Sequence, residues 1–280
     1  MQNICKGIEL NEETEYIKDD MIYCKTCNEP KIFDIGEEVG AVFGGRYKRV
    51  VCKCEQEKQR QEEERKKREQ QEQYYKVLQT NSLLGKRYKD VSFENTELDG
   101  DESFIKAFNT CKKYVENYER VLQDGKGIYL YGTSGNGKTH LMACMVNYLI
   151  RKGKECLITN LFEISKEIRK TFNGGGMTES EFLERLTNIP FLFIDDIGTE
   201  RLQNNGEDTF IQERLYDIIN TRYINMKPTI FSSNLNLVEL ISKKGMLEKT
   251  VDRINGMIYK KLEIKGESYR TKNIDSSFLD

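Results

Sequence analysis

The chain has 280 residues, of which 38% are hydrophobic and 32% are charged, and its net charge at pH 7 is -2. This length allows one large domain, or one medium-sized domain with an appendage. With only three prolines and no tryptophan, the composition argues against a loop-rich secreted scaffold. The near balance of acidic and basic residues hides local extremes, so nucleic-acid binding through a local patch is not excluded.

Compartment and membrane association are suggested by what the sequence lacks. The first 20 residues, MQNICKGIELNEETEYIKDD, are acidic and have neither the basic region nor the apolar segment of a signal peptide. No apolar run approaches the roughly 20 residues that a membrane-spanning helix needs. Eight cysteines without a secretion signal indicate reduced thiols or metal ligands rather than disulfides. We therefore expect a soluble, cytoplasmic protein without a membrane partner.

The first predicted domain, residues 1–54, contains five of the cysteines. Two close pairs, CKTC and CKC, predict a zinc site, in which four thiolates surround the metal tetrahedrally with Zn–S distances of ~2.3 Å. The only histidine, His140, lies far away in the sequence, so the ligands would be thiolates alone. The four predicted zinc ligands are Cys24, Cys27, Cys52 and Cys54.

Two alternatives to this ligand set remain open. Cys5 could replace one of the four thiolates, because the second pair has the less usual CxC spacing. The CxxC pair could also be a redox motif, although no thioredoxin-like βαβ pattern surrounds it. A segment this polar has little core, so a bound metal would supply much of its folding energy.

Residues 55–85 form a second predicted zone, a linker. Its segment EQEKQRQEEERKKREQQEQYYK, from Glu55 to Lys76, is almost wholly charged or amide and contains no Gly or Pro. Many opposite charges lie at helical spacing, which favours a helix. Because the segment has no apolar stripe, we expect a solvated connecting helix rather than a core element. A partly disordered linker is the alternative.

The third predicted domain, residues 86–280, alternates short β-rich apolar runs with segments of helical periodicity. Four runs predict buried strands, namely GIYLY (Gly127–Tyr131), CLITN (Cys156–Asn160), FLFID (Phe191–Asp195) and TIFSS (Thr229–Ser233). The stretch NGGGMTES at Asn173–Ser180 marks a break between two helices. This alternation predicts the α/β class, with a parallel sheet covered by helices on both faces.

A glycine-rich stretch, GTSGNGKT, follows the first of these strands and leads directly into a helical segment, as in a P-loop. Its glycines would let backbone N–H groups face a polyphosphate, and the helix N-terminus adds partial positive charge. Lys138 would reach the β- and γ-phosphates, and the hydroxyl of Thr139 would bind Mg²⁺. The residues expected around the phosphates are Gly132, Thr133, Ser134, Gly135, Asn136, Gly137, Lys138, Thr139 and His140.

Polar residues also follow two further strands. FLFIDD ends in Asp195, a candidate magnesium ligand, and Asp196, which could polarise an attacking water. Asn234, just past TIFSS, could orient that water, although Asn at a strand end is also a common turn residue. Open α/β sheets bind ligands at the carboxyl ends of their strands, so these motifs predict a site for magnesium and a nucleoside triphosphate. Arg253, in EKTVDRI, reads on its own as a surface arginine on a short helix.

Five motifs, GTSGNGKTHL, FLFIDDIG, TIFSSNL, VDRI and ESYR, occur in this order along the chain. Together they resemble the AAA+ ATPases of the bacterial and phage replicative helicase-loader family (DnaC/DnaI type), close relatives of the IstB transposition helpers. The resemblance covers about Lys86 to Asn273, and the combination of DDIG with SSNL is more specific than the P-loop alone. It implies an AAA+ P-loop ATPase domain with a five-stranded parallel sheet and ATP as the nucleotide.

The resemblance also implies roles for individual residues. Lys138 and Thr139 match the Walker A motif, whereas Asp195 and Asp196 match Walker B. Asn234 matches sensor I.

Two arginines take their implied roles from the same resemblance. Arg253 matches the arginine finger, which reaches the γ-phosphate bound by a neighbouring subunit and so implies a self-oligomer. Arg270, in SYR, matches sensor II. Many AAA+ proteins have Glu where this chain has Asp196, and the shorter side chain favours slow hydrolysis, suited to a timer or switch stimulated by DNA or assembly.

The segment LFEISKEIRKTF resembles the extra helix with which this family contacts single-stranded DNA. Basic side chains there could follow a phosphate backbone while an aromatic ring stacks on a base, which is worth roughly 1–3 kcal/mol per base. The alternative is an ordinary amphipathic helix with solvated cations and a core phenylalanine. The residues that the resemblance assigns to DNA are Lys166, Arg169, Lys170 and Phe172.

The resemblance implies an ATP-dependent loader that binds a hexameric replicative helicase through its N-terminal module and delivers it to single-stranded DNA, and the order of the three zones fits this expectation. A transposition helper of the IstB type is one alternative, but such helpers usually lack a separate four-cysteine module. A zinc-anchored adaptor that binds ATP without productive hydrolysis is a second. A nucleotide kinase would need an arginine-rich lid and an acceptor pocket, and the sequence indicates neither.

Overall fold

A computed structural model describes residues 10–19, 21–43, 45–98, 101–172, 178–198, 206–266 and 268–269. The chain divides into two compact units, Met1–Gln73 and Tyr74–Asp280. None of the helices that the model describes combines the length and the apolar character needed to cross a lipid bilayer.

The first unit contains two small antiparallel sheets, in which β1 pairs with β2 and β3 pairs with β4. Its elements are β1 (Glu15–Lys18), β2 (Met21–Cys24), β3 (Ile32–Asp34), α1 (Glu37–Phe43), β4 (Tyr47–Arg49) and the first part of α2 (Lys53–Asn81). Among the described residues of this unit, the buried hydrophobic side chains are Ile22, Cys24, Ile32 and Cys52. Two of these four are cysteines, so apolar packing alone gives the unit little stability.

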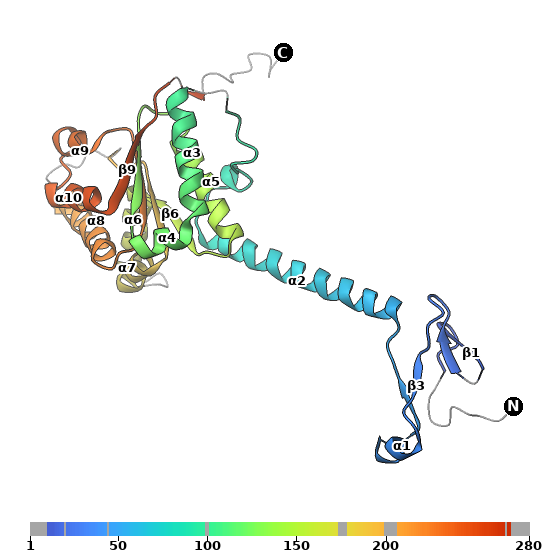
Figure 1. Ribbon diagram of the computed structural model, residues 1–280. Helices are drawn as coiled ribbons and strands as arrows, with labels where there is room; N and C mark the ends of the chain where they lie inside the picture. Colours follow the sequence, from blue (N-terminus) through green and yellow to red (C-terminus); the bar gives the residue numbers. More distant parts are fainter. Residues whose placement is uncertain are drawn as a thin grey trace, which may run out of the picture. The chain divides into compact units, whose positions relative to one another are not determined.

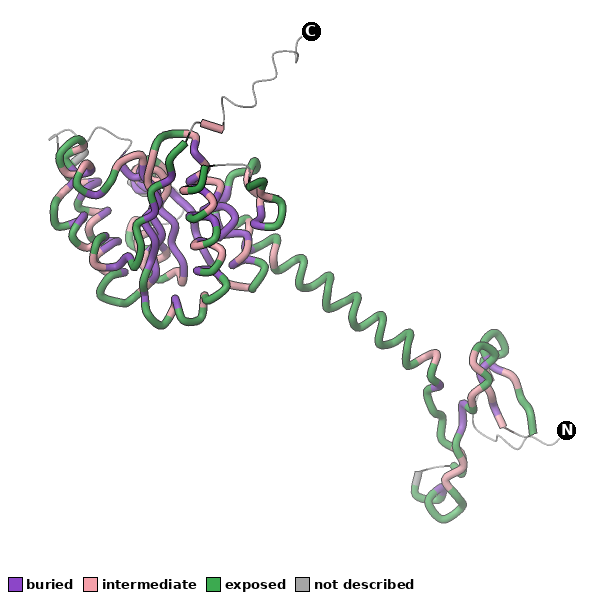
Figure 2. The backbone as a smooth tube through the Cα atoms, turned by 45° about the horizontal axis from the view of Figure 1, so that its top comes forward, coloured by how far each residue is buried: buried purple, intermediate pink, exposed green. Residues whose placement is uncertain are grey.

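Helix α2 confirms the solvated helix that the charged composition predicts. Residues 56–74 are all exposed, as the uninterrupted green stretch of the helix shows (Figure 2). The helix continues beyond the charged segment, to Asn81, because its last turns belong to the second unit. There Leu78 is buried and Tyr75 packs against the core. Ion pairs at helical spacing, such as Arg65 with Glu62 and Glu69, lie along its exposed face.

The second unit is built on a five-stranded parallel sheet in the order β6-β7-β8-β5-β9 (Figure 1). Its strands are β5 (Gly127–Tyr131), β6 (Cys156–Asn160), β7 (Phe191–Asp195), β8 (Thr229–Ser233) and β9 (Ile258–Glu263). The four strands that the apolar runs predict are therefore confirmed. The edge strand β9 was not readable as a strand, because Tyr259, Lys260 and Lys261 are all exposed and break the alternation of buried and exposed residues.

Helices cover both faces of this sheet (Figure 1). One hydrophobic cluster lies under α3 and α5, and a second lies under α6, α7, α8, α9 and α10. The helices of this unit are η1 (Lys86–Tyr88, a 3-10 turn), α3 (Glu102–Glu116), α4 (Tyr118–Asp124), α5 (Lys138–Arg151), α6 (Leu161–Phe172), α7 (Glu179–Asn188), α8 (Gly206–Ile224), α9 (Leu237–Lys244) and α10 (Glu248–Met257). This arrangement confirms the predicted α/β class.

Strand order brings the predicted nucleotide motifs together. β8 lies between β7 and β5, and all three strands run in the same direction. The P-loop follows β5, the paired aspartates end β7, and Asn234 follows β8. The three motifs therefore meet at the carboxyl edge of three adjacent strands, where open α/β sheets bind their ligands.

Candidate functional site

Two glycines of the P-loop occupy positions that a larger residue would not tolerate. Gly137 is the N-cap of α5 with φ of 94°, and a Cβ there would lie 2.6 Å from the ring of Phe104. Gly132 has φ of 141°, and its Cβ would lie 2.0 Å from the carbonyl oxygen of Ile264. Positive φ is easily reached only by glycine. The loop is thus fixed at its start by the segment after β9 and at its end by α3.

The ammonium group of Lys138 lies at the centre of the loop. Its Nζ donates to the carbonyl oxygens of Gly132 at 2.8 Å and Thr133 at 2.7 Å. It also donates to the side-chain oxygens of Asn234 at 3.0 Å and Asn136 at 3.2 Å. All four acceptors are neutral oxygens, and together they hold the ammonium at the centre of the loop. A lysine ammonium in this position can bind a phosphate anion as a point charge.

Thr139 and Asp195 lie in direct contact at the tips of α5 and β7. The Thr139 hydroxyl donates to one carboxylate oxygen of Asp195 at 3.0 Å and lies 3.3 Å from the other. Ser232 of β8 donates to the same carboxylate, and its Oγ accepts the backbone N–H of Asp196 at 2.8 Å. A hydroxyl and a carboxylate side by side supply the oxygen ligands that Mg²⁺ prefers. Ser232 is a positioning residue that the sequence motif TIFSSN contained but that we had not singled out.

Asp196 and Asn234 form the other side of the same site. Asn234 donates through Nδ2 to Asp196 Oδ1 at 3.1 Å and accepts the Lys138 ammonium through Oδ1. The amide therefore links the lysine to the second aspartate. Asp196 has φ of 56°, a left-handed conformation that is uncommon for residues other than glycine and recurs at functional sites. Here it turns the backbone directly after the strand, and the Asp196 side chain faces the amide.

These groups line a cleft with a volume of about 470 Å³, large enough for a nucleotide. Its polar end is formed by the P-loop together with Asp196, Ser232 and Asn234. The remaining wall is mixed: Tyr88, Val91 and Phe104 are apolar or aromatic, and polar and charged side chains from the segment before α3 lie among them. The phosphate-binding groups at one end and the rings on the wall are compatible with a nucleotide.

His140 also lines this cleft, and its protonation state follows from its partner. The hydroxyl of Thr96 donates to the carbonyl oxygen of Ser92 at 2.6 Å and lies 2.8 Å from His140 Nε2. Burial lowers the pKa of His140 below its usual value, so the neutral imidazole is favoured at pH 7. The tautomer with its proton on Nε2 can donate to the Thr96 hydroxyl.

Arg253 lies on α10 and is absent from the described residues that line this cleft. Its guanidinium contacts the neighbouring Asp252 at 3.3 Å. It also contacts two residues of α8 that the sequence did not reveal, Asn220 and Tyr223. Arg270, the other arginine assigned by resemblance, lies outside the described residues, as does Cys5.

The helix assigned to DNA contact is α6. Lys166 pairs with Glu163 at 3.3 Å and Lys170 pairs with Glu167 at 2.6 Å, so both exposed lysines are partly compensated within the helix. Arg169 is exposed on the same helix, whereas the side chain of Phe172 lies outside the described part of the chain. One aromatic residue that we had not singled out, Phe162 in the first turn, is 62% exposed.

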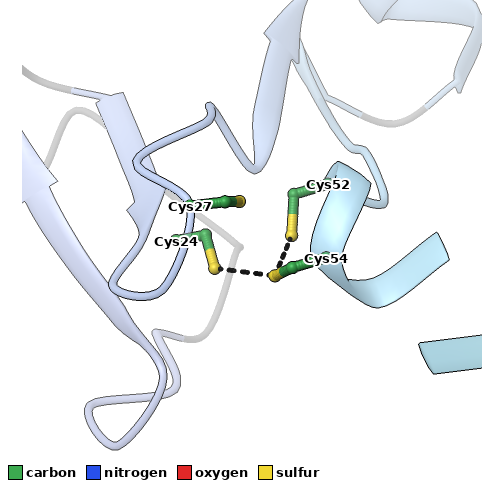
Figure 3. A group of neighbouring side chains, drawn as sticks. All are labelled: Cys24, Cys27, Cys52 and Cys54. Carbon is green, nitrogen blue, oxygen red and sulfur yellow. Dashed lines mark hydrogen bonds between the residues drawn. The ribbon is translucent and has the colours of Figure 1, made fainter. Parts of the chain in front are cut away.

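The four cysteines of the first unit converge on one point (Figure 3). Their sulfur atoms all lie within 4.8 Å of one another, and Cys54 Sγ lies 3.5 Å from Cys24 Sγ and 3.3 Å from Cys52 Sγ. A tetrahedral zinc site with Zn–S bonds of ~2.3 Å separates its sulfur atoms by ~3.8 Å. Cys24 is the last residue of β2 and Cys27 lies in the turn after it, whereas Cys52 directly precedes α2 and Cys54 lies in its first turn (Figure 3). The donor set and its spacing fit zinc.

The pKa values of these thiols diverge because the groups are crowded. Backbone N–H groups of Cys27 and Thr26 lower the pKa of Cys24 to about 6. Hydrogen bonds with Cys52 and Cys24 raise the pKa of Cys54 to about 12. Without a metal, such a cluster keeps protons that a metal ion would displace.

Charged residues tie the first turn of α2 to the rest of this unit. Lys31, only 4% exposed, pairs with Glu55 of α2 and lies 3.8 Å from the buried Glu15. Burial disfavours the charge of Lys31, but the Glu55 carboxylate outweighs this effect and raises its pKa. Lys53 donates from its backbone and its ammonium to Glu29, at 2.9 and 2.6 Å. Every residue from 52 to 55 therefore contacts the segment from 24 to 31.

Comparisons with known proteins agree with this fold and site. Residues 55–277 match the model of the family described as IstB-like ATP binding protein. The replicative helicase loader DnaC of Buchnera aphidicola subsp. Baizongia pistaciae is 30% identical over 203 residues, which are 70% of this chain and 78% of that protein. DnaC of Escherichia coli K12 is 29% identical over 60% of this chain and 64% of that protein.

A solved structure of a helicase loader has the same fold as the second unit of this chain. A crystal structure of the DnaC helicase loader is 28% identical, has a TM-score of 0.55 and covers 65% of this chain and 100% of that one. The five-stranded sheet, with its nucleotide motifs at one edge, is thus the AAA+ fold of the DnaC type. The chain belongs to the family of IstB-like ATP-binding proteins.

Proposed function

We propose that this protein is an ATP-regulated loader that binds a hexameric replicative helicase in the cytoplasm and delivers it to single-stranded DNA. The observation that carries the proposal is the linked set Lys138–Asn234–Asp196 beside Thr139–Asp195. At one sheet edge it brings together a cation that would bind phosphate, a hydroxyl–carboxylate pair that would bind Mg²⁺ and an amide–carboxylate pair that would orient a water molecule. Similarity to replicative helicase loaders supports the loading role.

The mechanism assigned to the cleft follows from its contacts. Lys138 and the loop backbone would bind the β- and γ-phosphates, and Thr139 with Asp195 would hold Mg²⁺, which neutralises charge on the phosphates. Asp196 would polarise the attacking water, and Asn234 would orient it. Asp196 is one methylene shorter than the Glu usual in AAA+ proteins, so we expect slow turnover that assembly or DNA accelerates. Arg253 would complete the site of a neighbouring copy.

Two further parts of the proposal concern DNA and metal. The exposed face of α6, including Lys166, Arg169 and Lys170, would contact single-stranded DNA, with Phe162 or Phe172 stacking on a base. The four-cysteine cluster would bind zinc, which supplies a structural cross-link between the β2 turn and α2. We propose 1–54, 55–85 and 86–280 as the helicase-binding module, linker and ATPase domain.

A transposition helper remains the second candidate because the family model is named for that group. The matched region starts at residue 55, directly after the last clustered cysteine, so the module is an addition to the family core. An additional module is what a loader needs to bind a specific protein partner.

Helicase transfer to closed circular single-stranded DNA tests the proposal. The full chain with ATP should increase the amount of cognate hexameric helicase on the circles, and Lys138→Ala should abolish this increase together with ATP binding. A matched control is Lys152→Ala, because Lys152 lies at the other end of α5. If the full chain retains the helicase but transfers none with any nucleotide, the adaptor alternative holds and the loader proposal fails.

A further inference from the structure

Two side chains of α8 hold the guanidinium of Arg253 in a defined position. Arg253 Nε donates to Asn220 Oδ1 at 2.9 Å. The guanidinium carbon lies 5.1 Å from the centre of the Tyr223 ring, within the range of a cation–π contact. Asn220 and Tyr223 are three positions apart on α8 and so share one face of that helix, the face that packs on α10.

The shape of α10 permits this arrangement. Gly256 lies three residues after Arg253 on the same helix, and a Cβ at Gly256 would come within 3.0 Å of the Tyr223 ring. The missing side chain lets the ring lie close to the helix backbone and reach the guanidinium. An alanine at this position would press on the edge of the Tyr223 ring, although a helix would otherwise favour alanine there.

Both partners from α8 are electrically neutral, which matters for what Arg253 can still bind. The Asn220 amide accepts one of the five N–H donors of the guanidinium, and the ring uses its face. Among the residues that the structure describes, the carboxylate that pairs with Arg253 is that of Asp252, which is 73% exposed, so water screens the pair and it contributes little. The cation is therefore oriented while its charge and most of its donors remain available to an anion.

We propose that Asn220 and Tyr223 are positioning residues that preorganise Arg253 for the terminal phosphate of ATP bound by a second copy of the chain. This rests on the proposed trans role of Arg253. The entropy lost on ordering a long, flexible side chain at an interface lowers the contribution of each contact it makes. A guanidinium that is already ordered in the free protomer avoids that loss when two copies meet.

The neighbouring pair on the same helices provides a matched control. Lys249 Nζ lies 4.2 Å from the centre of the Tyr216 ring, again with the cation on α10 and the ring on α8. Tyr216→Leu therefore removes a cation–π contact from the same helix–helix interface without touching Arg253. It separates a general loosening of α8 and α10 from a specific effect on the finger.

The experiment measures kcat and KM for ATP hydrolysis under assembling conditions in full-length variants. Asn220→Ala and Tyr223→Leu should each lower kcat about three- to tenfold and leave KM unchanged, because each removes one weak contact to a transition-state group. Tyr223→Phe, which keeps the ring face, should restore kcat to within about twofold of wild type. Tyr216→Leu should also stay within about twofold. A kcat for Tyr216→Leu as low as that of Tyr223→Leu would overturn the proposal.

Mixed assemblies test whether the effect crosses a subunit boundary. Copies carrying Lys138→Ala have a defective cleft but an intact Arg253, so an excess of them should restore turnover in Asn220→Ala copies. No restoration overturns the positioning role in trans. If Arg253→Ala itself leaves kcat unchanged, the proposed function of Arg253 fails instead. If Arg253→Ala lowers kcat but the α8 variants do not, only the positioning role fails.

Discussion

The nucleotide cleft and the four-cysteine centre are both built from side chains that lie far apart in the sequence, but different forces bring them together. The cleft lies at the edge of a sheet in which strands β5 to β8 are almost completely buried between two hydrophobic clusters. The cysteine centre belongs to a unit whose buried hydrophobic residues, among those described, include only Ile22 and Ile32 besides two of the cysteines. The geometry of the cleft is therefore a consequence of the fold, whereas the fold around the cysteines needs its own cross-link.

Because of this difference, we expect the two regions to respond differently when their sites are perturbed. Ser232, Asn234 and Lys138 are held by hydrogen bonds to groups that the core already fixes. Around the cysteines, residues 52–55 hold the start of α2 mainly through thiols, ion pairs and a backbone hydrogen bond to Glu29, with little hydrophobic core among the described residues of this unit. Perturbing the metal should thus unfold one region, and perturbing the cleft should change its chemistry without unfolding it.

The largest effect we expect comes from removing the metal. Zinc chelation, or Cys54→Ser, should abolish the structure of the first unit, because metal binding is folding free energy where little core exists. Nuclear magnetic resonance of the full chain should then lose the dispersed signals of residues 10–52 and keep those of the second unit.

The control for that prediction is Cys5→Ser, which should keep about one zinc per chain. A metal content that falls with Cys5→Ser would instead identify Cys5 as a ligand. Dispersed signals that survive complete chelation would show that the cluster is dispensable for folding, and the contrast between the two regions would fail.

The second-largest effect concerns a buried cation of the ATPase domain. Arg222 is fully buried, and its guanidinium donates to carbonyl oxygens that include those of Leu186, Ile189 and Pro228, at 2.8 to 2.9 Å. Arg222→Met leaves these acceptors buried without donors, so the free energy of unfolding should fall by about 3–5 kcal/mol. Denaturant unfolding measures the loss.

Arg214→Met is the matched control on the same helix. Arg214 is partly exposed and pairs with Glu179 and Asp217, so its loss should cost about 1 kcal/mol or less. Equal losses for the two variants would mean that the ATPase domain does not depend on its buried polar contacts in the way we describe.

The sequence predicts the local features of the fold and the site well, but it does not predict contacts between distant segments. Strands β5 to β8 were predicted with their observed bounds because each is a continuous apolar run between polar residues. Residues at the ends of such strands, Asp195 as the last residue of β7 and Asn234 directly after β8, could be placed at one edge because parallel strands end together. The four cysteines were recognisable because the spacing within each pair is short.

Contacts between distant segments were not readable. The link between Thr96 and His140 spans 44 residues, and that between Asn220 and Arg253 spans 33. Neither has a local signal, because an Asn on a helix or a Thr in a loop is more often solvated than engaged. Lys31 was missed for a similar reason, since a lysine is rarely buried and its partners Glu15 and Glu55 are not adjacent in sequence.

A smaller effect should follow from changing the charges next to the cysteines. Lys31→Met removes a buried cation from beside Cys52 and leaves Glu55 without its partner. Outer-shell changes of this kind typically lower metal affinity about 10–100-fold, and we expect a value near the lower end. Competition with a chromophoric chelator measures the zinc affinity.

The control is Lys53→Met, which changes a side chain that is 83% exposed and should lower the zinc affinity less than about threefold. Equal effects would indicate that only net charge matters, not burial.

The smallest effect concerns the histidine beside the P-loop and depends on pH. Because burial lowers the pKa of His140, the folded chain binds this proton less readily than the unfolded chain does. The neutral imidazole therefore makes its full contribution to the free energy of unfolding above the unfolded pKa of about 6.5. This contribution declines as the pH falls from there toward the lower pKa of His140 in the folded chain.

His140→Gln keeps a donor for the Thr96 hydroxyl and cannot titrate, so the ATPase domain of this variant should lose less stability between pH 6.5 and 5. The difference should be about 1 kcal/mol or less, measured as the change in unfolding midpoint with pH. Parallel pH profiles for both proteins would mean that the folded and unfolded chains bind this proton equally, and that the cleft wall is open to water at His140.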